Sequence, residues 1–150
     1  LKIGAMSIDM PYVDGRWIGG AITNFTEIKK RIAKFEDLQK QKEKGELAKY
    51  TKKERLLIDR EIDNLDSMFS GIVSMKEAPK ALFVIDPKKE FIAVAEAKKA
   101  GIPVIALSNT DCNIKTIDFP IVANDASVSS IAFFVSEIVK SYKAGKTAKA

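Results

Sequence analysis

Residues 81–87 read Ala-Leu-Phe-Val-Ile-Asp-Pro, and this stretch decides the fold class. Its five apolar residues stand in one continuous run, which is typical of a parallel strand that is covered on both faces. A second such run, Pro-Val-Ile-Ala-Leu, occupies residues 103–107, and residues 119–123 predict a third, shorter strand. The three runs together predict a parallel sheet.

The segments around these strands predict helices that cover the sheet. Residues 89–100 carry a helical apolar pattern closed by Gly101, residues 108–115 form a polar loop, and residues 127–142 predict a further helix. This order predicts an α/β fold with right-handed crossovers. Three strands are few for such a sheet, so we expect part of it to lie before Leu1. Residues 143–150 are small and basic and predict a flexible tail.

Residues 24–72 carry a different pattern, with one narrow apolar stripe on each of two helices. The spacing is three or four residues, which is the spacing of a helix seam, at Phe25, Ile28, Ile32, Phe35, Leu38 and again at Ile58, Ile62, Leu65, Phe69, Ile72. Asn24 with Glu27 and Thr51 with Glu54 fit capping boxes, and Gly45 separates the helices. The prediction is an antiparallel coiled-coil hairpin at residues 24–72, inserted into an α/β body made of residues 1–23 and 73–150.

Composition limits the chemistry. The 150 residues suffice for about one domain, and the net charge of +5 favours polyanionic partners such as RNA. One cysteine, Cys112, excludes a disulfide within the chain, and the lack of histidine removes the commonest general base and metal ligand. We read Cys112 as an incidental loop thiol. No apolar run approaches the ~20 residues that span a bilayer, and residues 1–12 do not resemble a signal peptide. We therefore expect no cofactor, no metal and no membrane partner.

An enzyme remains an alternative, because ligands of open α/β sheets bind at the carboxyl ends of the strands. Asp86, Asn109 and Asp125 stand at those ends and are candidates for a small nucleotide- or sugar-phosphate-binding enzyme. The same residue types also close turns and cap helices, and we favour that structural interpretation. No phosphate-loop motif follows a strand.

Basic residues and a glycine pair are the candidates for RNA contact. Gly19-Gly20 could hold a phosphate at the start of a helix, or could serve only backbone freedom. Trp17 could stack on a base, although we favour anchoring in the core. A set of basic residues on the hairpin could face phosphates or could form an ordinary solvated surface. The set is Lys29, Lys30, Arg31 and Lys34, with Lys52, Lys53 and Arg55 at the far end.

Four stretches resemble one known family. Residues 16–25 read Arg-Trp-Ile-Gly-Gly-Ala-Ile-Thr-Asn-Phe, and with residues 47–54, 78–86 and 96–104 they are similar in order and spacing to the bacterial small-subunit ribosomal protein number two. The resemblance extends from about Pro11 to Tyr142. The family's N-terminal part is missing here, a proline is lost from the turn at residues 109–114, and a glycine and an arginine are lost at residues 122–128.

The resemblance implies a Rossmann-like, flavodoxin-type sheet with a coiled-coil hairpin, and a non-enzymatic role on the cytoplasmic ribosome. The implied partners are small-subunit rRNA and neighbouring ribosomal proteins, including the large mRNA-binding one. The hypothesis is a structural protein of the small subunit, with a protein-interaction module that binds no RNA as a further alternative. The expected RNA-binding residues are Arg16, Asn24, Lys29, Lys30, Arg31, Lys34, Lys52 and Lys53.

Overall fold

The sheet is parallel and has three strands. A computed structural model describes residues 1–148 as a mixed α/β protein, with β1 (Leu82–Ile85), β2 (Val104–Ser108) and β3 (Phe119–Val122) in the order β1-β2-β3. Cα partners such as Leu82 with Val104 set the register of the first pair. Central β2 is buried along nearly its whole length because it has a neighbour on each side. The three predicted strands are confirmed to within one residue at each end.

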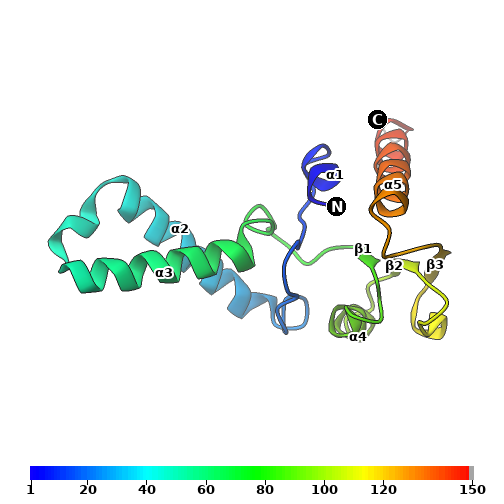
Figure 1. The fold of residues 1–150 in the computed structure, drawn as a ribbon, viewed down its shortest axis with the longest axis horizontal. Helices are drawn as coiled ribbons and strands as arrows, with labels where there is room; N and C mark the ends of the chain where they lie inside the picture. Colours follow the sequence, from blue (N-terminus) through cyan, green and yellow to red (C-terminus); the bar gives the residue numbers. More distant parts are fainter. Residues whose placement is uncertain (149–150) are drawn as a thin grey trace.

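Helices lie on both sides of the sheet. Helix α4 (Phe91–Lys99) lies on one side, with the 3₁₀ helix η2 (Ile114–Thr116), and α5 (Val128–Ala148) lies on the other side with the short α1 (Lys2–Met6), as Figure 1 shows. Helix α1 was not predicted. It packs closely on α5, since a Cβ added at Gly4 would lie 2.5 Å from a Val135 methyl carbon.

Helix α5 is longer than its sequence pattern predicts. Its apolar spacing ends at Tyr142, yet the helix continues through Ala148, so the tail prediction is wrong for residues 143–148. Lysine and alanine are strong helix formers, and they extend a helix beyond its apolar stripe. Residues 149 and 150 of that predicted tail lie outside the described residues. None of the helices within residues 1–148 combines the length and apolarity needed to cross a bilayer.

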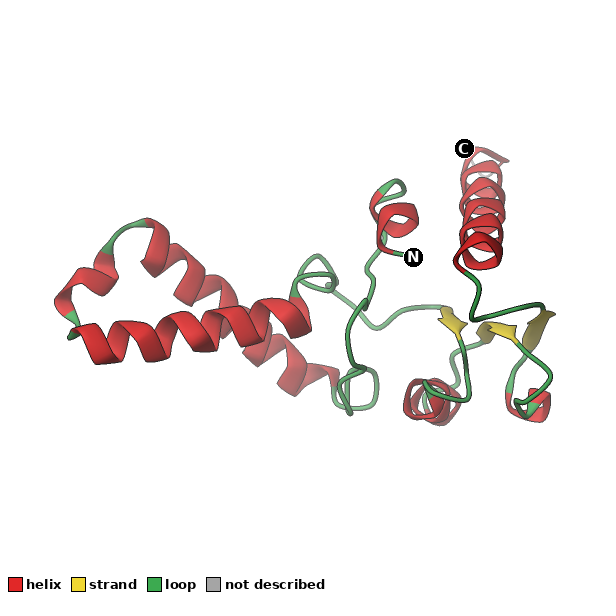
Figure 2. Cartoon of the chain, in the orientation of Figure 1, coloured by secondary structure: helices red, strands yellow, loops and turns green. Residues whose placement is uncertain are grey.

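A pair of long helices forms a hairpin that extends away from the sheet. Helix α2 (Phe25–Glu43), the 3₁₀ helix η1 (Glu46–Lys49) and α3 (Lys52–Phe69) follow one another, and α2 packs on α3 (Figure 2). The capping box of Thr51 and Glu54 is confirmed. The one predicted at Asn24 is wrong, because its side chain makes no capping bond and Glu27 instead pairs with Lys30 at 2.6 Å.

The buried residues form two separate hydrophobic clusters. The sheet cluster lies between α4 and the sheet and contains Ile22, Val84, Val94, Ala97, Val104, Ala106 and Ile117. The hairpin-base cluster contains Ile28, Ile32, Phe69 and Ile72. Residues 17–23, which we call the connecting loop, contribute to both, because Trp17 and Ile22 pack in the sheet cluster and Ile18 packs in the hairpin-base cluster.

The segment after α1 passes close to the turn that follows the hairpin. The Tyr12 N–H donates to the Gly71 carbonyl oxygen at 2.9 Å. A Cβ added at Gly71 would lie 2.2 Å from the Tyr12 carbonyl oxygen, so a side chain does not fit there. This contact joins the segment after α1 to the C-terminal end of the hairpin.

Candidate nucleic-acid interface

The predicted RNA-binding lysines and arginines fall into two groups on the hairpin. Lys29, Lys30, Arg31 and Lys34 lie in the first half of α2, near the sheet. Lys52 and Lys53 begin α3, after the turn at the far end of the hairpin. The two groups therefore lie toward opposite ends of the hairpin (Figure 1), and a single short RNA segment does not reach both. An interface that uses both groups has to run along the hairpin.

Several of these lysines already have partners in the protein. Lys30 pairs with Glu27, Lys34 pairs with Glu61 of α3, and the Lys29 ammonium lies 5.0 Å from the centre of the Phe25 ring. Exposed ion pairs contribute ~0–1 kcal/mol, so a phosphate could displace the carboxylates. The Lys34–Glu61 pair also joins α2 to α3, which gives Lys34 a structural role.

The remaining cations of the predicted set carry no such pair. Arg16, Arg31, Lys52 and Lys53 form no salt bridge with a carboxylate of residues 1–148. All four are exposed, and they can meet a phosphate without first losing an internal partner. Asn24 is exposed as well, at the N-cap of α2 and close in sequence to the first basic group.

Trp17 serves as an anchor rather than as an exposed stacking platform. Its ring packs against the sheet cluster, and its Nε1–H points to Glu96 Oε1 at 3.5 Å. The anchoring interpretation of Trp17 is therefore confirmed. Neighbouring Arg16 is exposed, so the pair places one side chain partly buried against the sheet cluster and one in solvent.

The Gly19-Gly20 turn already binds an anionic group from the chain itself. Gly20 adopts φ +89°, a conformation that favours glycine. Its N–H donates to Glu96 Oε1 at 2.6 Å, and the N–H of Ile22 donates to Oε2 of the same carboxylate at 3.1 Å. The backbone donors that a phosphate would need are therefore occupied, and the phosphate interpretation of this turn is not supported.

Glu96 is the residue that sequence reasoning missed. Partial burial raises the pKa of its carboxyl group. The hydrogen bonds from the N–H groups of Gly20, Ile22 and Thr23 together lower the pKa by more than burial raises it, so the pKa lies below its ordinary value. Glu96 stands within one of the four stretches that carry the family resemblance. Its local pattern is that of any glutamate on a helix, and the only available signal was its place in that stretch.

Two of the three residues proposed for an enzyme site, Asp86 and Asn109, make local turn contacts at the strand ends. Asp86 accepts from the Lys89 N–H at 3.1 Å and pairs with the Lys89 ammonium at 3.0 Å. Asn109 Oδ1 accepts from the Thr110 N–H at 2.8 Å, and Asn124, beside Asp125, accepts from the N–H groups of the two residues just before α5. No group of three metal-ligating side chains occurs in the part of the chain that the structure describes. These contacts fit the structural interpretation of the strand ends.

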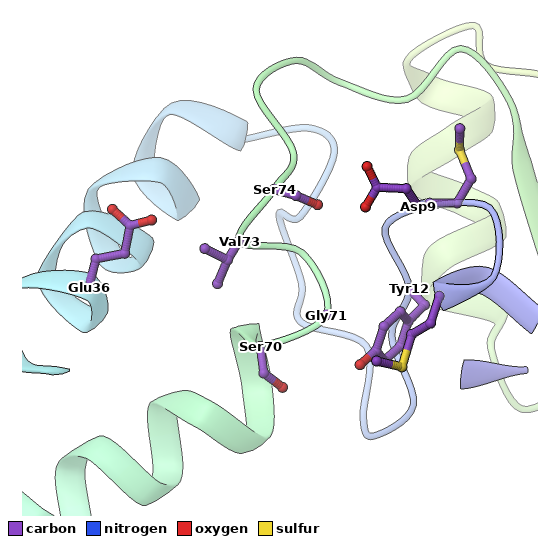
Figure 3. A pocket seen from close by; sticks show the side chains of 9 residues that line it. Asp9, Tyr12, Glu36, Ser70, Gly71, Val73 and Ser74 are labelled. Carbon is purple, nitrogen blue, oxygen red and sulfur yellow. The ribbon is translucent and has the colours of Figure 1, made fainter. Parts of the chain in front are cut away.

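A hollow at the base of the hairpin is lined by none of the predicted site residues. It has a volume of about 460 Å³ and lies between the segment after α1 and residues 70–74 (Figure 3). Asp9 and Glu36 supply its charged side chains, and the lining includes no lysine or arginine. Two carboxylates disfavour a phosphate, so the hollow is unsuited to an RNA backbone.

Comparison with known proteins identifies similar chains. The family model described as ribosomal protein S2 matches residues 2–145. Small ribosomal subunit protein uS2 of Helicobacter hepaticus is 43% identical over 147 residues, which cover 98% of this chain and 56% of that protein. The protein of the same name from Wolinella succinogenes is 42% identical over 146 residues, 97% of this chain and 54% of that protein. The chain thus spans a little over half the length of these relatives.

Proposed function

Because this chain belongs to the ribosomal protein S2 family, we propose that it is a structural, non-enzymatic component of the small ribosomal subunit. One observation carries the proposal, namely the charged hairpin that extends away from the sheet with exposed cations toward both ends. The proposed partners are small-subunit rRNA and neighbouring ribosomal proteins, including the large mRNA-binding one. The proposed location is the ribosome in the cytoplasm.

The proposed RNA interface follows the hairpin and its root. Arg31, Lys52 and Lys53 have no internal carboxylate partner within residues 1–148 and supply the primary phosphate contacts. Arg16 and Asn24 extend the interface to the connecting loop. Lys29, Lys30 and Lys34 join it after they exchange their internal contacts for phosphate. Phosphate contacts position a protein on RNA without reading its sequence, so the interface recognises shape and charge.

The first prediction concerns the salt dependence of binding to small-subunit rRNA. The triple variant Arg31→Ala/Lys52→Ala/Lys53→Ala should bind more weakly than the unmodified chain. The slope of log affinity against log salt should fall in magnitude by about 2 to 3, since each of the three lost phosphate contacts removes ~0.7–0.9. Fluorescence anisotropy with labelled rRNA between low and moderate salt measures both quantities.

A variant with the same charge change elsewhere is the matched control. Lys140→Ala/Lys143→Ala/Lys146→Ala removes three cations from α5, on the other side of the sheet from α4. Its salt slope should stay near that of the unmodified chain. Equal slopes for both triple variants would contradict a hairpin interface. Undetectable RNA binding by the unmodified chain would favour the protein-interaction alternative.

We also propose that the sheet belongs to a larger Rossmann-like sheet and that the hairpin is a coiled coil. Strand β1 is at the edge of the sheet, with β2 on one side only. An apolar groove of about 1090 Å³ lies beside it, between the sheet and the helices α1 and α5, and its lining includes Phe83, Ile105, Val135 and Val139. An apolar groove at an open strand edge suits a further strand. The similar proteins have the additional length to supply one.

A longer form of the protein tests this proposal about the sheet. A chain that carries the relatives' additional N-terminal length should bind less of the dye 8-anilinonaphthalene-1-sulfonate than residues 1–150 alone. The reason is that a strand in the groove covers Phe83 and Ile105. Dye fluorescence at equal molar concentration and the exchange rates of the β1 amides measure the effect. Equal dye fluorescence and equal β1 exchange in the two forms would contradict it.

A further inference from the structure

Glu96 of α4 joins the sheet to the connecting loop. Its carboxylate accepts from the N–H groups of Gly20, Ile22 and Thr23 at 2.6, 3.1 and 3.3 Å, from the Thr23 hydroxyl at 3.3 Å, and from Trp17 Nε1 at 3.5 Å. The donors lie more than 70 positions from Glu96 in sequence. One side chain of the sheet body therefore organises the whole connecting loop.

The connecting loop is where the hairpin meets the sheet. Ile22 packs in the sheet cluster, Ile18 packs in the hairpin-base cluster, and α2 begins at Phe25. Among residues 82–148, Glu96 is the one side chain that hydrogen-bonds any residue of the segment 12–80. The apolar contacts are not directional, whereas these bonds fix both the place and the orientation of the loop.

We propose that Glu96 is a positioning residue that holds the hairpin at a set orientation to the sheet, and so pre-organises the RNA interface. An ionised carboxylate with several N–H donors makes charge-assisted hydrogen bonds, which are stronger than neutral ones. A hairpin without this anchor samples a wider range of orientations, and RNA binding then has to restrict them. The hydrogen bonds of Glu96 support the fixed orientation of the hairpin, and the effect on RNA binding rests on the proposed function.

The variant Glu96→Gln keeps the size of the side chain and removes its charge. One amide end would then present an NH₂ group to backbone donors, so at least one bond is lost. The matched control is Glu90→Gln, which makes the same change at the N-cap of α4, where the side chain makes no capping bond. The amide protons of Gly20 and Ile22 should exchange about tenfold faster in Glu96→Gln than in the control, from the strength of bonds to charged groups.

The orientation of the hairpin is measured as a distance between two spin labels. Cys112, the one cysteine of the chain, lies partly exposed in the loop after β2, and Ala48→Cys adds a second label at the exposed far end of the hairpin. The distance distribution should be narrow in the control and broad in Glu96→Gln, while the circular dichroism of both stays the same. Glu96→Asp keeps the charge, so its distance distribution should be narrower than that of Glu96→Gln. Equal distributions and equal exchange in control and variant would overturn the proposal.

Acid should act on the unmodified chain as Glu96→Gln does. The pKa of Glu96 is lowered from its ordinary value of 4.5, so the anchor is fully present above 4.5 and is lost as the pH falls through the folded-state pKa. Asp118 lies just before β3, and its carboxylate accepts from the Val104 N–H at 2.8 Å. The spin-label distance distribution of the unmodified chain should broaden as the pH falls. The distance distribution of Glu96→Gln should change less. Charged side chains on the elements around Glu96 include Glu90 at the N-cap of α4, Lys98 and Lys99 on α4, Lys115 on η2, and Arg16 beside the connecting loop.

RNA binding separates this proposal from the proposed function. Glu96→Gln keeps every phosphate contact, so its affinity for rRNA should fall severalfold while its salt slope stays unchanged. The hairpin triple variant should instead change the slope. If Glu96→Gln broadens the distance distribution but the unmodified chain binds no rRNA, the proposed function is contradicted and the positioning role of Glu96 is still supported. A salt slope that falls in Glu96→Gln would count against a positioning role.

A second variant covers the case in which Glu96→Gln fails to fold. Thr23→Val removes one donor to the carboxylate, at an exposed position, and keeps the charge of Glu96. The Gly20 and Ile22 amides should then exchange about threefold faster than in the unmodified chain, from the net value of one hydrogen bond. Unchanged exchange in Thr23→Val would overturn the proposal.

Discussion

Replacing Phe69 with alanine should lower the free energy of unfolding by about 3–5 kcal/mol, the usual range for a buried phenylalanine. Phe69 is the last residue of α3, is 0% exposed, and lies in the hairpin-base cluster with Ile28, Ile32 and Ile72. Truncation removes the ring from a site where α2, α3 and the following turn meet. Urea unfolding followed by circular dichroism measures the loss.

The neighbouring residue provides the control for Phe69→Ala. Met68 lies one position earlier on α3 and is 38% exposed, so Met68→Ala should cost less than about 1 kcal/mol. Amide exchange should also rise more in the first half of α2 than in the sheet, because Ile28 and Ile32 lose their partner. Comparable stability losses in the two variants would show that the hairpin base is not a packed core.

Replacing Leu107 with alanine should cost about 2–5 kcal/mol, the range for buried leucine truncations. Leu107 is 0% exposed in the central strand, where its Cα partners are Ile85 on β1 and Ile121 on β3. Strand β2 has neighbours on both sides, so little nearby structure can move to fill the cavity. The free energy of unfolding from urea titration is again the measurement.

An exposed apolar residue on η2 is the control for Leu107→Ala. Ile114 is 51% exposed, so Ile114→Ala should change stability by roughly 0.5 kcal/mol. The Leu107 variant should also speed exchange of the β1 and β3 amides that pair with β2. A stability loss no larger than that of Ile114→Ala would contradict the burial of the central strand.

Local sequence pattern was sufficient for the three strands and for the hairpin helices, but not for α1 or for the last part of α5. The continuous apolar runs predicted all three strands, and the three-and-four spacing predicted both hairpin helices. Thr51 and Glu54 predicted a capping box that forms, because both partners lie within one turn. The box predicted at Asn24 fails because Glu27 has a competing partner one turn later, in Lys30. The two boxes have the same spacing, and they differ in whether the glutamate meets its cap or a competing lysine.

The candidate RNA interface was predictable only as a set of basic residues. Sequence placed the cations on the hairpin, and the structure separates those with a carboxylate partner from those without one. Lys34 meets Glu61 across the hairpin, 27 positions away, and this pairing depends on how α2 and α3 pack. Charge counting cannot distinguish Lys34 from Arg31, although their readiness to bind phosphate differs.

The sequence by itself determined the family, the strands, the two long helices and the basic character of the hairpin, because these depend on residue type and on short-range periodicity. Only the tertiary structure decided that two hydrophobic clusters exist, that the Gly19-Gly20 turn is occupied, and that Glu96 holds the connecting loop. The physical reason is distance along the chain. Glu96 and Gly20 are 76 positions apart, and a hydrogen bond between such residues has no periodic trace in the sequence until the fold brings donor and acceptor together.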